Sequence, residues 1–212
     1  MLYNGIEFLC KFFFRFQIGT IQGIDNLPPP PCIIVANHVS PYDPMLLVVM
    51  LYSWLKKYNK KIIFLTNRKV IVLFAPFRKT FGMFPGTKRG LNEAVDFLKR
   101  GIPIGVFPNR DRKPGQIKKF HLGPAYLAAK SKVPIVPIGI KTREEVYPSW
   151  NLIKIIKSYF YKKNIIIGKP ILVNNSRTLY KTTEELTSVV GNLINKEMIK
   201  PTLEYNNRNI KD

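Results

Sequence analysis

Residues 32–44 of the chain are Cys-Ile-Ile-Val-Ala-Asn-His-Val-Ser-Pro-Tyr-Asp-Pro. The first five are apolar and rich in β-branched side chains, which predicts a short strand buried in the core. Four prolines at 28–31 keep the preceding segment extended. Asp43 followed by Pro44 is typical of a helix start, where a carboxylate caps the first turn and proline fits the first helical position. These residues therefore predict a strand, a tight polar turn that carries His38 at the strand's carboxyl end, and a helix.

Similar segments alternate along the rest of the chain. Short apolar runs predict further strands at residues 61–66, 102–107, 133–141 and 164–168. Helical patterns occur at residues 44–58, 90–100 and 123–131, and a last helix is expected to begin at Thr182 or Thr183. Strands alternating with helices predict an α/β fold, a single domain with a mostly parallel mixed sheet flanked by helices. Ligands bind such sheets at the carboxyl ends of the strands.

The composition predicts a globular protein with a basic surface. Of the 212 residues, 46% are hydrophobic, enough for a large core in one domain, and the net charge is +21. This charge attracts anionic partners, such as phospholipid headgroups, phosphorylated or thioester-carrier substrates, or nucleic acid. No nucleic-acid-binding motif accompanies it, which argues against nucleic acid. The lysines at 56–61 and 162–163 are predicted to be solvated, and together they favour an anionic membrane surface.

Neither a metal site nor a disulfide framework is expected. The chain has two cysteines, Cys10 and Cys32, without a CxxC spacing, and two histidines, His38 and His121. Cys32 falls within a predicted strand and is expected to be part of the core. His121 stands ahead of a predicted helix and is expected to be a loop or capping residue.

Residues 1–18 are predicted to form an amphipathic helix. One face carries Leu2, Ile6, Leu9, Phe13 and Phe16, and the opposite side carries Asn4, Glu7, Lys11 and Arg15. Such a helix either lies in a membrane interface or packs on the protein's own core, and the net charge favours the membrane.

The rest of the chain is expected to form one unit, with residues 19–200 as the domain and residues 201–212 as a flexible tail. No apolar run reaches the about 20 residues that a membrane-spanning helix needs. Basic residues lie within the N-terminal apolar stretch rather than before it, unlike in a secretory signal. We therefore expect a peripheral or monotopic protein on the cytoplasmic face of the membrane.

His38 and Asp43 are the candidate catalytic pair. Each also has a purely structural interpretation, His38 as a hydrogen-bonded loop residue and Asp43 as a helix cap. Because they are five residues apart across a Ser-Pro turn, the two side chains can meet. The carboxylate would then hold one imidazole nitrogen while the other faces solvent. That arrangement suits a general base that takes a proton from a hydroxyl.

At this turn the sequence resembles a known family, the glycerolipid acyltransferases of the lysophosphatidic acid acyltransferase group. The matching residues are Asn37-His38-x-Ser40-x-x-Asp43, the NHxSxxD form of that family's HX4D motif. Residues 82–90, Gly-Met-Phe-Pro-Gly-Thr-Lys-Arg-Gly, resemble the second block, in which a basic residue binds the acceptor's phosphate. Residues 133–138 and 165–171 resemble the fourth block and the strand after it. The likeness covers residues 23–171 in the family's order.

The third block differs from the family's pattern. Where the family has Phe-Pro-Glu-Gly-Thr-Arg, this chain has Phe107-Pro108-Asn109-Arg110-Asp111-Arg112. An uncharged amide replaces the carboxylate, and a long side chain replaces a glycine that allows close backbone approach. Asp111 is a possible source of the missing carboxylate, from two positions away.

The resemblance implies an enzyme of phospholipid biosynthesis that moves a fatty acyl group from a thioester to the hydroxyl of a lysophospholipid. The favoured acceptor is 1-acyl-glycerol-3-phosphate. His38 would be the base and Asp43 its partner, and Arg89 or Lys88, with Arg112, would bind phosphate. The implied substrate-binding residues are Asn37, Ser40, Gly82, Lys88, Arg89, Phe107, Pro108, Asn109 and Arg112.

The resemblance implies no cofactor, because the thioester of coenzyme A or acyl carrier protein is itself a substrate. Two alternatives stay open. The acceptor could be another lysolipid, such as an aminolipid or lysophosphatidylglycerol. The protein could also be a noncatalytic, basic membrane-binding protein.

Overall fold

The structure is a computed structural model that describes residues 12–66, 82–108, 112–113, 116–117, 119–142, 152–173 and 178–195. Within these ranges seven strands form one sheet in the order β1-β9-β8-β2-β5-β3-β4. Their bounds are β1 Ile18–Gln22, β2 Ile33–Ala36, β3 Ile63–Thr66, β4 Met83–Pro85, β5 Ile104–Val106, β8 Ile135–Thr142 and β9 Lys163–Ile167. A separate antiparallel pair consists of β6 (Arg112–Lys113) and β7 (Gln116–Ile117).

The strand directions decide which residues meet at one edge of the sheet. β2 runs parallel to β8 and β5, and β3 runs parallel to β5 and β4. β9 is antiparallel to β8, and β1 is parallel to β9. The sheet is therefore mostly parallel and mixed, as predicted. The starts of β1 and β9 lie at the same edge as the carboxyl ends of β2 and β8.

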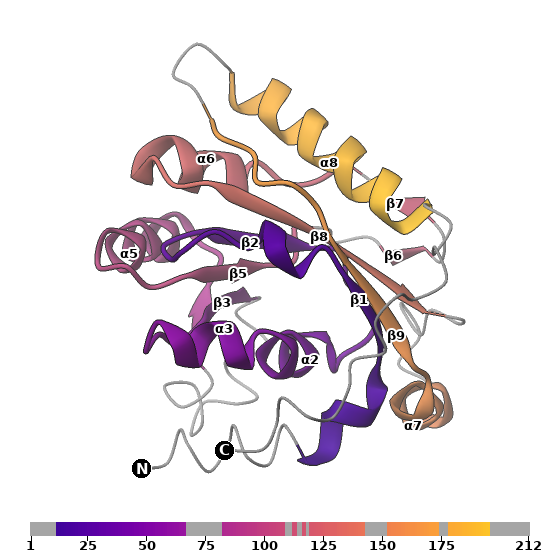
Figure 1. The fold of residues 1–212 in the computed structure, drawn as a ribbon. Coiled ribbons are helices and arrows are strands. Elements are labelled where there is room, and N and C mark those ends of the chain that lie inside the picture. Colours follow the sequence, from indigo (N-terminus) through magenta and orange to yellow (C-terminus); the bar gives the residue numbers. More distant parts are fainter. Residues whose placement is uncertain are drawn as a thin grey trace.

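Helices cover both faces of the sheet (Figure 1). α2 (Asp43–Met50) and α3 (Tyr52–Lys57) lie on one face, and α5 (Lys88–Lys99), α6 (Gly123–Ser131) and α8 (Leu179–Asn195) lie on the other. β2 supplies both cores by alternation, because successive side chains of a strand point to opposite faces. Ile34 and Ala36 pack in the core beneath α2, whereas Ile33 and Val35 pack in the core beneath α5 and α6. All four side chains are fully buried, which explains the uninterrupted apolar run.

Most predicted elements are confirmed within two residues, but two predictions need correction. The single helix expected at 44–58 is two helices, α2 and α3, separated at Leu51. The last helix begins at Leu179, a turn earlier than expected, because the Thr178 hydroxyl oxygen accepts the Lys181 N–H at 3.3 Å. Thr182 and Thr183 lie buried within the helix, and their hydroxyls donate to backbone carbonyls four residues earlier.

The sequence patterns did not reveal β1, β4 or α7 (Leu152–Phe160). β1 is a half-buried edge strand without the apolar run that marked β2. Residues 1–11 and 201–212 lie outside the described residues, so most of the predicted N-terminal helix and the whole predicted tail do too. In the described part, residues 12–14 are helical, Arg15–Gln17 form a 3-10 turn, and Ile18 already belongs to β1.

Candidate active site

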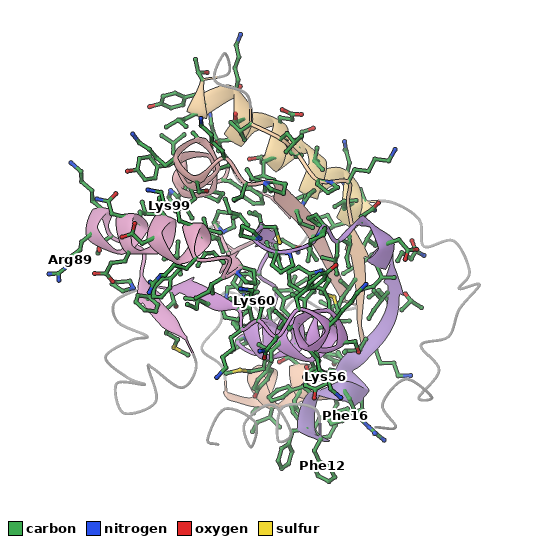
Figure 2. All side chains as sticks on the ribbon, turned by 60° about the vertical axis from the view of Figure 1, so that its left-hand side comes forward. Phe12, Phe16, Lys56, Lys60, Arg89 and Lys99 are labelled. Atoms are coloured by element: carbon green, nitrogen blue, oxygen red, sulfur yellow. The ribbon has the colours of Figure 1, made fainter. Side chains whose placement is uncertain are left out.

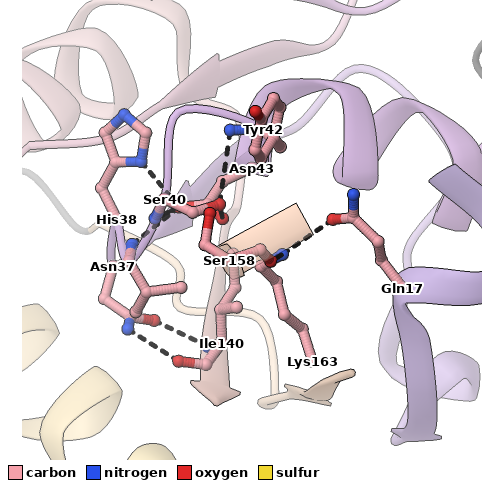
Figure 3. Close-up of polar contacts among 10 residues, drawn as sticks. Gln17, Asn37, His38, Ser40, Tyr42, Asp43, Ile140, Ser158 and Lys163 are labelled. Atoms are coloured by element: carbon pink, nitrogen blue, oxygen red, sulfur yellow. Dashed lines mark hydrogen bonds and ion pairs between the residues drawn. The ribbon is translucent and has the colours of Figure 1, made fainter. Parts of the chain in front are cut away.

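Asp43 organises the turn between β2 and α2 (Figure 3). Its buried carboxylate oxygen Oδ2 accepts hydrogen bonds from the backbone N–H groups of Val39 at 2.6 Å and Ser40 at 2.8 Å. Oδ1 accepts the Ser40 hydroxyl at 2.7 Å. The carboxylate therefore ties back to the preceding turn, whereas the sequence suggested a cap on the helix that follows. Pro44 occupies the first helical turn as expected.

His38 completes this arrangement. Its Nδ1 lies 2.7 Å from Asp43 Oδ2, so the predicted contact between the two side chains is present. Because an ionised carboxylate only accepts hydrogen bonds, the neutral form of the imidazole carries its proton on Nδ1 and its lone pair on Nε2. The imidazole also stacks on the Phe107 ring, with centroids 4.5 Å apart, and the ring of Phe107 stacks in turn on Phe64. The carboxylate and the aromatic ring thus fix the orientation of an imidazole that is only 11% exposed.

Asn37 and Ser40 hold the turn that carries His38 and Asp43 through buried polar contacts. The amide of Asn37 donates from Nδ2 to the Ile140 carbonyl at 2.8 Å and accepts the Ile140 N–H at 2.7 Å. These bonds continue the pairing of β2 with β8 for one more residue, so that the turn starts at a fixed place. The Ser40 hydroxyl, besides donating to Asp43, accepts the Tyr42 N–H at 3.3 Å.

The second block lies at the same edge of the sheet as His38. Pro85, at the end of β4, is level with Thr66 of β3, and three strand steps separate β4 from β2. At about 4.8 Å a step, the ends of β4 and β2 lie about 14 Å apart. A side chain on Gly90 would collide with the Pro85 carbonyl, so glycine lets the helix start close to the strand end. Thr87 caps α5 by accepting the Gly90 N–H at 3.2 Å.

Lys88 and Arg89 open this helix and face solvent. The Arg89 side chain is 92% exposed and pairs with Glu93 on the next turn, at 3.2 Å. Figure 2 shows Arg89 projecting outward from α5. Gly82 precedes β4 with a left-handed φ of 57°.

The third block is described only in part. Pro108 is buried and its carbonyl accepts the His121 N–H at 3.2 Å. Residues 109–111 lie outside the described residues, and for Arg112 the structure gives the β6 backbone alone. His121 is an exposed loop residue before α6, in agreement with the prediction.

One residue near the site was predicted wrongly. Lys163, expected to be solvated, is 1% exposed, and its ammonium donates to Gln17 Oε1 at 2.7 Å and to the Ser158 carbonyl at 3.4 Å. Burial lowers the pKa of Lys163, while the negative charge of Asp43 acts in the opposite direction. Lys163 and Gln17 are 146 residues apart, so no local pattern could have paired them.

Replacing Lys163 with methionine should make stability less dependent on pH. Because burial lowers the pKa of Lys163, the unfolded chain binds more protons than the folded chain between that lowered pKa and the ordinary lysine value of about 10.4. The free energy of unfolding of the natural protein therefore rises with pH across this window. Urea unfolding at about pH 7 and about pH 10 should show a smaller rise for Lys163→Met.

Lys162→Met is the matched control, because the neighbouring Lys162 is exposed. This control should show the same rise as the natural protein. An equal rise in all three proteins would contradict the effect of burial on Lys163.

Cys32 cannot serve as a nucleophile at neutral pH. The side chain, just before β2, is fully buried in the core beneath α2, and burial raises the pKa of its thiol to about 12. In the described part of the chain, no group of three or more His, Cys, Asp or Glu side chains could hold a metal ion.

Comparisons with known proteins agree with this fold. A family model described as "Acyltransferase" matches residues 19–141, more than half of the chain. The chain belongs to this acyltransferase family. Enzymes of the family need no cofactor, because the acyl donor is a substrate.

Curated relatives share part of the sequence. The 1-acyl-sn-glycerol-3-phosphate acyltransferase BAT2 of Brassica napus is 32% identical over 146 residues, which cover 64% of this chain and 41% of that protein. The 1-acyl-sn-glycerol-3-phosphate acyltransferase of Pseudomonas aeruginosa is 25% identical over 136 residues, which cover 56% of this chain and 48% of that protein. The chain thus spans less than half the length of the curated relatives it matches.

A solved structure shares the fold. The 1-acyl-sn-glycerophosphate acyltransferase PlsC of Thermotoga maritima superposes with a TM-score of 0.68 and 19% sequence identity. The match covers 91% of this chain and 80% of that one. It supports the single α/β domain deduced from the strand order.

Proposed function

We propose that this protein transfers a fatty acyl group from an acyl thioester to the hydroxyl of a lysophospholipid, in phospholipid biosynthesis. 1-Acyl-glycerol-3-phosphate is the favoured acceptor, as the names of the relatives suggest. The observation that carries the proposal is the contact of His38 Nδ1 with the buried carboxylate of Asp43, at the carboxyl edge of the sheet.

In the proposed reaction, His38 Nε2 removes the proton from the acceptor hydroxyl as its oxygen attacks the thioester carbonyl. Asp43 stabilises the imidazolium that forms, since its charge lies 2.7 Å from Nδ1. When the tetrahedral intermediate collapses, the carbon–sulfur bond breaks and the departing thiolate takes the proton back from Nε2. The acyl group passes directly to the acceptor, because Cys32 is an inert thiol and the Ser40 hydroxyl donates to Asp43 rather than to His38.

A thiol-release assay with a panel of acceptors tests this function. The panel contains 1-acyl-glycerol-3-phosphate, lysophosphatidylglycerol and a lyso-aminolipid, each offered with an acyl-coenzyme A and an acyl carrier protein donor. We expect the fastest release with 1-acyl-glycerol-3-phosphate. Faster release with another acceptor would reassign the substrate, and no release with any pair would favour the noncatalytic membrane-binding protein.

We propose that Lys88 or Arg89, together with Arg112, binds the acceptor's phosphate. Arg89→Ala should raise KM for the phosphorylated acceptor about 10- to 100-fold, the effect of losing a charge-assisted hydrogen bond, with little change for the thioester. Steady-state kinetics with each substrate varied in turn measure the two effects. Lys99→Ala, an exposed cation at the other end of α5, is the control and should be neutral. Equal losses for both substrates would make Arg89 structural, and a larger effect of Lys88→Ala would transfer the role to Lys88.

The third block is proposed to set acceptor preference. Asn109 and Arg110 stand where the family has glutamate and glycine, so the double change Asn109→Glu with Arg110→Gly restores both charge and backbone access. We expect higher turnover of 1-acyl-glycerol-3-phosphate relative to the other acceptors in the thiol-release assay. Asn109→Glu alone is the control, since Arg110 would partly neutralise the new carboxylate. An unchanged ratio in the double variant would contradict a role in acceptor choice.

The protein is further proposed to act at the cytoplasmic face of the membrane, held there by residues 1–18. Phe12, Phe13 and Phe16 are exposed, as this anchor requires, and the net charge of +21 favours anionic lipid. In the part of the chain that the structure describes, no helix has the length and hydrophobicity to cross a bilayer.

The triple variant Leu2→Ser, Ile6→Ser, Leu9→Ser of the full chain tests this anchor. It should sediment more weakly than the natural protein with anionic liposomes, because the apolar face of the helix is removed. Unchanged sedimentation would refute the anchor.

A further inference from the structure

α7 exposes an apolar face. Ile153, Ile156 and Phe160 are 64%, 52% and 70% exposed, and their spacing places them along one side of the helix. The exposed Lys157 lies on the same side. Ser158 is buried and Tyr159 half-buried, so the helix is attached to the domain by its other side. A contiguous apolar surface of this kind on a folded domain usually marks a site of interaction with a membrane, a ligand or another protein.

α7 packs beside residues 12–16, where Phe12, Phe13 and Phe16 are also exposed. The Tyr159 hydroxyl donates to the Phe13 carbonyl at 2.7 Å, and the Tyr159 ring lies 5.0 Å from the Phe16 ring. Figure 2 shows Phe12 and Phe16 pointing outward together at one end of the molecule. We define the α7 face as Phe12, Phe13, Phe16, Ile153, Ile156 and Phe160. Of nine exposed large hydrophobic residues in the described chain, these are six.

In the two described segments that carry the α7 face, the charged side chains are all basic. Residues 12–24 and 152–173 contain no aspartate or glutamate. Arg15, Lys157 and Lys162 are exposed in these segments. Apolar side chains flanked by lysine and arginine match the acyl and headgroup layers of an anionic bilayer.

The two segments that carry the α7 face also pack against the turn of the candidate active site. The Tyr42 ring packs 5.8 Å from the ring of Phe14 and 5.7 Å from that of Tyr159. Tyr42 immediately precedes Asp43 in the turn that holds His38. The sheet topology explains this closeness, because the residues before β1 and β9 emerge at the edge where β2 ends.

We infer that α7, together with Phe12, Phe13 and Phe16, docks on an anionic lipid bilayer and brings the His38 turn to its surface. This surface shares Phe12, Phe13 and Phe16 with the proposed anchor in residues 1–18, and it adds α7, a helix from a distant part of the chain. Its benefit to catalysis rests on the proposed function, since a lysophospholipid could then reach His38 without leaving the membrane. Docking itself does not depend on that function.

Flotation of the full-length protein with vesicles of phosphatidylglycerol and phosphatidylcholine tests the docking. The triple variant Ile153→Ser, Ile156→Ser, Phe160→Ser should bind about tenfold more weakly or worse. The matched control is Ile24→Ser, Leu172→Ser, Tyr180→Ser, three residues that are 44–68% exposed elsewhere on the protein. It should bind like the natural protein, and circular dichroism should show both variants folded. Unchanged binding of the α7 variant, or equal losses in both variants, would overturn the inference.

Further measurements distinguish a lipid bilayer on the α7 face from a second copy of the chain or acyl carrier protein. They also test membrane docking separately from the proposed acyl transfer. If gel filtration showed that the α7 variant changes oligomeric state, the assignment of the α7 face to lipid would be overturned. Weaker binding of acyl carrier protein by the variant, with unchanged flotation, would also overturn it. With acceptor embedded in vesicles, the α7 variant should lose acyl transfer, whereas with a short-chain, monomeric acceptor it should retain it. If the natural protein transfers an acyl group to neither acceptor, the proposed function is wrong. The flotation experiment still tests whether the α7 face docks on the bilayer.

Discussion

His38→Ala should reduce acyl transfer by about 10²- to 10⁴-fold, the usual contribution of a general base. In the proposed reaction the imidazole takes the acceptor's proton, and alanine leaves no base at that position. The fold should survive, because Asp43 keeps its bonds to the Val39 and Ser40 N–H groups without the imidazole. Thiol release under saturating substrate measures the loss, and thermal unfolding and vesicle flotation should match the natural protein.

His121→Ala provides the matched control, since it removes the chain's other histidine from an exposed loop. This variant should keep its turnover. Near-normal turnover of His38→Ala would refute the base assignment. A similar loss in both variants would point to a general effect of losing an imidazole.

Asp43→Asn is the second substitution with a large expected effect, a loss of turnover of up to about 10⁴-fold. Asparagine has the same shape, and its oxygen can still accept the N–H groups of Val39 and Ser40, so the turn should persist. What disappears is the negative charge 2.7 Å from Nδ1, which stabilises the imidazolium and fixes the ring's proton. Turnover and urea unfolding, measured on the same preparation, should separate the loss of activity from any loss of stability.

Two comparisons sharpen this experiment. Asp43→Ala should lose stability as well as activity, because buried donors on Val39 and Ser40 would lack acceptors, at about 1–3 kcal/mol each. Asp96→Asn, at an exposed carboxylate on α5, should change neither property. If Asp43→Asn kept near-normal turnover, Asp43 would be a purely structural residue.

The strand, turn and helix around His38 were predictable because their interactions are short in sequence. The apolar residues of β2 bury on both faces, and His38 meets Asp43 across only five residues. Contacts over so few residues are set mainly by local backbone geometry, so the contact between His38 and Asp43 could be predicted before the fold was known. Hydrophobic patterns did not identify strands that are only partly buried, such as the half-buried edge strand β1.

The order of strands in the sheet, which local sequence does not encode, decided which distant residues lie near one another. It placed Lys88 and Arg89 three strands from His38, and it brought Gln17 and Lys163 together across 146 residues, where Lys163 had been predicted to face solvent. It also set α7 beside residues 12–16 and next to Tyr42. A run of lysines or an amphipathic helix has the same local pattern whether it faces solvent, core or lipid. Only packing between distant segments determines which of its side chains are buried, because burial depends on neighbours that tertiary structure supplies.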